Sequence, residues 1–167
     1  MSNTNVFEKW DNTIDTVGLT NDINDAAVNG GTGDYKEVPH GDYEVALHQM
    51  ELKSSKKGDP MVSIWFKIVS DGEYKGSMIF FNQVITQGFQ IHLVNELLRK
   101  VVSEIENVDE YLQRIEDTKE KFSYKAYGNL IMDIFEDASE NFEYALSYKK
   151  GKGDFSKYEI TEVFPLD

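Results

Sequence analysis

Residues 38–82 have the pattern of three consecutive β-strands joined by polar, lysine-containing turns, and this stretch constrains the fold more than any other part of the sequence. The alternation is strictest over residues 61–69. One face carries Val62, Ile64, Phe66 and Ile68, and the other carries Met61, Ser63, Trp65, Lys67 and Val69. A period of two indicates a β-strand with one face in a core. With polar turns at 53–60 and at Asp71-Gly72, the pattern predicts strands over 43–52, 61–69 and 76–84.

The period changes after Gly88. Apolar residues then recur at helical spacing from Val94 to Ile105, which predicts a helix with one apolar stripe. Residues 108–121 predict a second, more exposed helix. Residues 124–138 fit a helix except for Gly128 and Asn129, so their structure stays open at this point. Residues 142–149 and 155–164 alternate again and predict a final hairpin around the glycine-rich turn 150–154.

This order of elements predicts a mainly β protein with a helical insert (α+β). Three strands, helices and a hairpin match the five-stranded oligonucleotide-binding (OB) fold barrel, with helices between strands 3 and 4. An α+β sandwich with its helices on one face is the alternative. We expect residues 38–167 to form a single OB-fold-like domain with the insert at about 88–140. Residues 1–37 would be a polar, partly flexible N-terminal segment, in which Phe7, Trp10 and Ile14 favour a short helix.

Composition excludes several kinds of chemistry. The 167 residues include no cysteine, which rules out disulfides and zinc–thiolate sites. The three histidines lack ligand-like spacing, and no catalytic triad, paired-acid pattern or nucleotide-binding loop is recognisable, so we expect no metal, no cofactor and no enzyme activity. The absence of a long apolar run and of a secretory signal predicts a cytoplasmic protein that does not enter a membrane.

The net charge of −13 argues against a phosphate-rich partner, but the acids are unevenly spread. Residues 1–34 have a net charge of −5 and residues 105–140 of −6, whereas the rest of the chain totals −2. The predicted sheet is therefore nearly neutral, and a local basic surface is compatible with this composition.

Trp65 and Lys67 fall on the face of the second strand opposite the aliphatic row. An aromatic ring can stack on a base while a neighbouring ammonium group pairs with the phosphate. The alternative is that Trp65 packs beneath the N-terminal segment or in a dimer contact, because large apolar side chains are seldom left bare.

Two lysine clusters occupy the turns that flank the nucleic-acid groove of an OB fold. The first comprises Lys53, Lys56 and Lys57, and the second comprises Lys149, Lys150, Lys152 and Lys157, with Phe155 and Tyr158 beside it. A single lysine-rich turn is usually plain solvated surface. If the chain adopts the OB fold, two lysine-rich turns in so acidic a protein favour nucleic-acid binding.

The segment from Val38-Pro-His-Gly-Asp-Tyr-Glu-Val, through the turn Lys53 to Pro60, to Asp71-Gly-Glu-Tyr-Lys-Gly76 resembles a family of bacteriophage early proteins. The resemblance covers about residues 38–105. Its members are often catalogued as a domain of unknown function and are considered single-stranded DNA-binding proteins with an OB fold. The resemblance implies a groove lined by Trp65, Lys67 and the Lys53–Lys57 turn, and partners among phage recombination or replication proteins.

We therefore expect a non-catalytic phage protein that coats single-stranded DNA in the host cytoplasm during replication or recombination. A homo-oligomer, most simply a dimer, is expected because exposed strand edges need covering. The alternative is an acidic phage effector that binds a host protein as a DNA mimic or inhibitor. A nuclease has only the abundance of carboxylates in its favour.

Overall fold

The computed structural model describes residues 37–151 and 156–166 and has a mixed α+β architecture. The strands are β1 (Gly41–Ser54), β2 (Pro60–Ile68), β3 (Met78–Val84), β4 (Phe142–Lys150) and β5 (Ser156–Pro165). The helices are α3 (Gly88–Val101), α4 (Val108–Asp117) and α5 (Tyr124–Asn141). Residues 1–36, where a short helix is expected, together with Lys152 and Phe155, lie outside the described residues.

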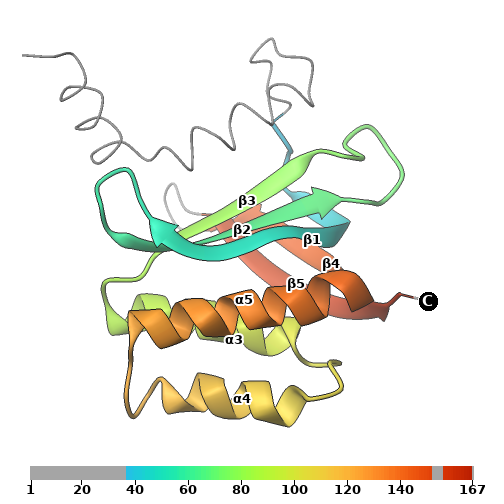
Figure 1. Ribbon diagram of the computed structural model, residues 1–167. Coiled ribbons are helices and arrows are strands. Elements are labelled where there is room, and N and C mark those ends of the chain that lie inside the picture. Colours follow the sequence, from blue (N-terminus) through green and yellow to red (C-terminus); the bar gives the residue numbers. More distant parts are fainter. Residues whose placement is uncertain (1–36, 152–155, 167) are drawn as a thin grey trace, which may run out of the picture.

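The five strands form one antiparallel sheet in the order β3-β2-β1-β4-β5. β1 pairs with β4 over Gly41–Val45 and with β2 over Val45–Ser54. The register shifts between Leu47 and Gln49, and such a bulge bends a strand and increases its twist. In Figure 1, β1, β2 and β3 lie above the helices, while β4 and β5 curl behind them. The sheet is not closed, since β3 and β5 do not pair, and the OB fold itself stays a prediction.

The gap between β3 and β5 is nevertheless bridged. The Tyr158 hydroxyl on β5 donates a 2.8 Å hydrogen bond to the Phe80 carbonyl on β3. The Tyr158 ring meets the Phe81 ring edge-on, with 5.1 Å between centroids, and α3 contacts both strands. We call this contact between the two edge strands the seam.

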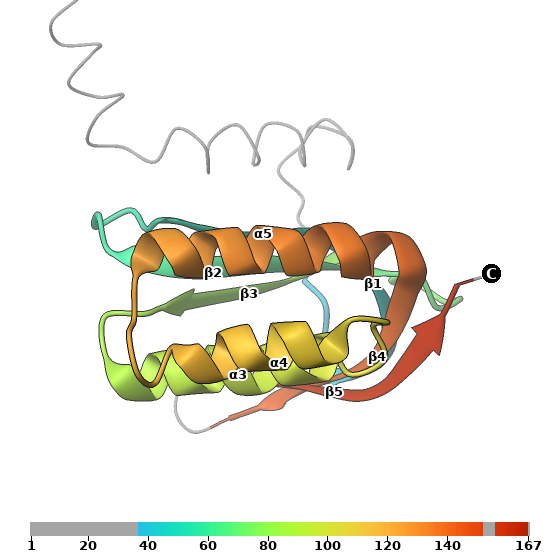
Figure 2. The same cartoon turned by 60° about the horizontal axis from the view of Figure 1, so that its bottom comes forward.

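The core lies between the sheet and the helices α3 and α5 (Figure 2). Val62, Ile64, Phe66 and Ile68 are almost completely buried, as the alternation of β2 predicts. The ambiguous segment 124–138 is helical and belongs to α5. The buried face of that helix outweighs the unfavourable helix propensity of Gly128, which is about 1 kcal/mol relative to alanine. This face comprises Tyr127, Leu130, Ile131, Ile134 and Ala138.

We predict that the seam weakens at alkaline pH. Burial, with a further contribution from Tyr148, raises the pKa of Tyr158 to about 12, against about 10 for an unfolded tyrosine. Because the pKa of Tyr158 is higher in the folded state than in the unfolded state, its protonated hydroxyl stabilises the fold. This stabilisation is fully present below pH 10 and is lost as the pH rises toward 12. The pKa of Tyr111 is raised as well.

Tyr158→Phe should lower the free energy of unfolding by about 1 kcal/mol at pH 7 and make the loss of stability at alkaline pH shallower. Urea denaturation at pH 7, 9 and 11 measures both effects, and an unchanged pH dependence in the variant would contradict the assignment.

Candidate nucleic-acid interface

Trp65 and Lys67 lie on the outer face of β2, away from the helices. Trp65 stands opposite Phe80 on β3 and Gln49 on β1. Its indole meets the Phe80 ring edge-on at 5.1 Å and runs nearly parallel to the His48 ring at 6.1 Å. The side chain is only 7% exposed, whereas Lys67 is exposed. The indole is therefore packed among its neighbours, and a base can stack on it only after one of them moves.

The row of residues beside Trp65 is polar. The Ser63 hydroxyl, which is fully buried, donates a 2.8 Å hydrogen bond to the side-chain oxygen of Asn82 on β3. The Gln49 amide donates to Glu51 at 2.8 Å along β1. These satisfied pairs give the outer face a defined hydrogen-bonding pattern next to its aromatic side chains.

The β1–β2 turn presents two of the predicted lysines to solvent. Lys56 and Lys57 are exposed, and Lys53 lies partly buried at the end of β1. Backbone hydrogen bonds close the turn between Ser55 and Asp59 at 2.7 Å, and between Gly58 and Ser55 at 2.9 Å. Gly58 has a φ of +88°, a conformation that glycine adopts without strain. The lysines therefore extend from a turn of defined geometry.

The second lysine cluster lies where β4 ends and β5 begins. Lys149 stands directly opposite Lys157 in the strand pairing, and both are exposed, as is Lys150. Tyr158 belongs instead to the inner side of the sheet, where it forms the seam. Figures 1 and 2 show the β1–β2 turn and the start of β5 at the same end of the molecule, opposite the β2–β3 turn.

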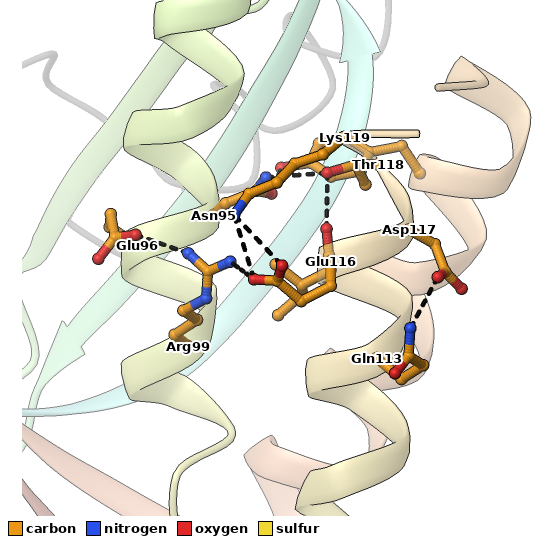
Figure 3. Close-up of polar contacts among 10 residues, drawn as sticks. Asn95, Glu96, Arg99, Gln113, Glu116, Asp117, Thr118 and Lys119 are labelled. Atoms are coloured by element: carbon orange, nitrogen blue, oxygen red, sulfur yellow. Dashed lines mark hydrogen bonds and ion pairs between the residues drawn. The ribbon is translucent and has the colours of Figure 1, made fainter. Parts of the chain in front are cut away.

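Some carboxylates of the helical layer form ion pairs, and one of these pairs joins α3 to α4 (Figure 3). Arg99 on α3 contacts Glu96 at 2.6 Å and also pairs with Glu116 on α4. Lys119 lies 3.2 Å from Glu116. Hydrogen bonds from Lys119 and Arg99 lower the pKa of the Glu116 carboxyl, so this acid is held in its charged form. A role in joining α3 to α4 accounts for this cluster.

A buried hydrogen-bond network continues this contact toward α5. The Asn95 amide donates to the Thr118 hydroxyl at 3.1 Å, as Figure 3 shows. The Tyr127 hydroxyl donates to Asn95 at 2.6 Å. One asparagine therefore joins α3 to α5 and to the residue that follows α4. Among the described residues, no group of three His, Asp or Glu side chains could hold a metal ion, and no helix is long and apolar enough to cross a membrane.

The sequence model of one protein family matches residues 22–109, which is more than half of the chain. That family is described as "Protein of unknown function (DUF669)". The chain belongs to the DUF669 family. The DUF669 match spans β1, β2, β3 and α3, and so includes Trp65, Lys67 and the lysines of the β1–β2 turn. No curated protein matches the chain.

Proposed function

We propose that this protein is a non-catalytic single-stranded DNA-binding protein that acts in the replication or recombination of a bacteriophage. The observation that carries the proposal is the placement of exposed lysines on the β1–β2 turn and beside the β4–β5 connection, at one end of a protein whose net charge is −13. Lysines at this end would neutralise phosphates, and aromatic side chains beside them would stack on bases.

The pairing of Lys149 with Lys157 supports this proposal. Like charges directly opposite each other on neighbouring strands are destabilising, and Lys150 adds a third charge one residue away. A phosphate bound at this position would remove the repulsion. Arrangements that are unfavourable in the free protein but favourable with a ligand are expected at binding surfaces.

The strand order also supports the proposal. In an OB fold, the face formed by strands 2 and 3 and the turns that join strands 1–2 and 4–5 bind oligonucleotides. Here β1 pairs with both β2 and β4, and a helical region follows β3. The described lysines lie on the β1–β2 turn and at the ends of β4 and β5 that flank the second turn. We propose that this sheet is a variant of that fold, with the seam in place of a closing ladder.

Trp65 provides a direct test, because the chain contains only two tryptophans. In a Trp10→Phe background, we expect oligo-dT to change the fluorescence of Trp65 as its ring exchanges a protein neighbour for a base. A Trp65→Leu variant should then bind more weakly by about 1–3 kcal/mol. Lys75→Ala, at the β2–β3 turn, is the control. Binding that leaves Trp65 fluorescence unchanged would place the stacking surface elsewhere.

An acidic effector that binds a host protein is the second candidate. The exposed carboxylates at the start of α4, Asp109 and Glu110, favour it, because such a surface can occupy a basic cleft. Retention of a host protein from nuclease-treated lysate, without oligonucleotide binding at low salt, would support this candidate. Salt-sensitive binding of oligo-dT in preference to duplex would support the first.

A further inference from the structure

Three segments that are distant in the sequence meet at the end of the molecule that carries the β1–β2 turn. The Ile85 amide donates a 2.9 Å hydrogen bond to the Pro60 carbonyl, at the close of that turn. The Tyr124 hydroxyl, at the start of α5, donates to the Ile85 carbonyl at 3.0 Å. Gly128, one turn further along α5, lies against Leu52 of β1. The starts of α3 and α5 are therefore held beside the lysine-bearing turn.

These segments are basic, in contrast to the rest of the chain. Residues 53–63, 84–95 and 121–132 contain five lysines and a single acid, Asp59. The whole protein has 17 basic and 30 acidic residues, so the remaining residues are strongly acidic. Lys56, Lys57, Lys121 and Lys125 are all exposed. A positive region of this kind, surrounded by negative charge, selects an anionic partner and steers its approach.

The same end exposes large apolar side chains. Phe89 is 62% exposed and Tyr124 is 43% exposed, and Leu93 is exposed one turn after Phe89. The Gln90 side chain accepts hydrogen bonds from the backbone amides of Thr86 and Gln87, at 2.9 and 3.0 Å, which fixes the start of α3. Phe89 is therefore presented from the first turn of a well-capped helix.

We propose that single-stranded DNA continues from the β1–β2 turn onto this surface and stacks bases on Phe89 and Tyr124. We call it the end surface, defined by Lys56, Lys57, Phe89, Leu93, Tyr124 and Lys125. The inference rests on the proposed function and adds stacking residues from the helical layer. Exposed rings and lysines at the same end complement a strand of bases and phosphates, and the scarcity of acids here disfavours a basic protein partner.

The test compares aromatic with aliphatic side chains of similar size. Phe89→Leu and Tyr124→Leu keep apolar bulk but remove the ring, and each should weaken binding of fluorescein-labelled oligo-dT by roughly five- to a hundredfold in anisotropy titrations. Tyr124→Phe removes the hydroxyl that bonds to Ile85 but keeps the ring, and should retain affinity. Met132→Ala is the matched control, since Met132 is 55% exposed on α5 beside an acidic residue, Asp133.

A charge substitution provides a second readout. Lys125→Ala should reduce the slope of log K against log salt by about 0.7, the contribution of one phosphate contact with a single strand. Lys75→Ala should leave that slope unchanged. Circular dichroism verifies that each variant is folded, and Phe89→Leu alone decides the stacking question if Tyr124→Leu unfolds.

The possible results separate the two proposals. If wild-type protein binds oligo-dT while Phe89→Leu and Lys125→Ala bind as wild type does, the end surface is wrong and the proposed function stands. If wild-type protein fails to bind at low salt, both proposals fail together.

Discussion

Replacing Lys56 and Lys57 together by glutamate should weaken the binding of oligo-dT by about twentyfold or more at 0.1 M salt. Each phosphate contact with a single strand contributes about 0.7 to the salt slope, and two lost contacts give an effect of this size before repulsion is counted. The two lysines are exposed on the β1–β2 turn and belong to the end surface as well as to the predicted groove. Anisotropy titrations at 0.05 and 0.2 M salt measure both the affinity and the slope.

A matched comparison uses single substitutions. Lys57→Glu and Lys75→Glu change the net charge equally, but Lys75 pairs with Asp71 at 3.0 Å near the β2–β3 turn. If the net charge of the whole protein determined its affinity for oligo-dT, both variants would lose affinity to the same degree. A loss confined to Lys57→Glu assigns the effect to the turn, and equal losses would contradict a local site.

Replacing Phe66 by alanine should destabilise the fold by about 3–5 kcal/mol. Phe66 is fully buried on the inner face of β2, the strand that lies between β1 and β3. Domains of this size have a total stability of about 5–15 kcal/mol, so the variant should be close to its unfolding threshold at 37 °C. Urea denaturation followed by circular dichroism gives the change in free energy.

Phe89→Ala is the control for Phe66→Ala, because the same atoms are removed from a side chain that is 62% exposed. It should change the free energy of unfolding by no more than about 0.5 kcal/mol. The pair also tests the end surface, since Phe89→Ala should weaken DNA binding while it leaves stability intact. A large loss of stability in Phe89→Ala would indicate that this ring is packed in solution.

The strands and helices were largely predictable because their apolar periods are regular. The buried row from Val62 to Ile68 and the apolar stripe of α3 both follow from spacing alone. The bulge near His48 was not predictable, since it depends on how β1 divides its pairing between β2 and β4. The seam could not be predicted either, because it joins the Tyr158 hydroxyl to the carbonyl of Phe80, which lies 78 positions earlier in the sequence.

The candidate site was predicted less completely than the fold. The alternation of residues 61–69 correctly predicted Trp65 on the outer face of β2. It could not predict that Phe80 and His48 pack against the indole ring. Phe89 was missed because it precedes the predicted apolar stripe, which begins at Val94, and Tyr124 because it begins a segment whose structure stayed open. The available signal was the lack of acids over residues 84–95 and 121–132, which becomes informative only when the hydrogen bonds of Ile85 bring these segments together.

The divided pairing of β1 has a consequence for how the chain folds during synthesis. Residues 41–44 of this strand pair only with β4, and Val45 and its β4 partner Tyr144 are nearly a hundred positions apart. Contacts of such long range slow folding, because a large loop must close before they form. On the ribosome, β1 can pair with β2 and β2 with β3 early, while residues 41–44 wait for almost the whole polypeptide to emerge. Completion of the sheet is therefore a late event, and the edge of β1 is the surface through which nascent chains are most prone to misassociate.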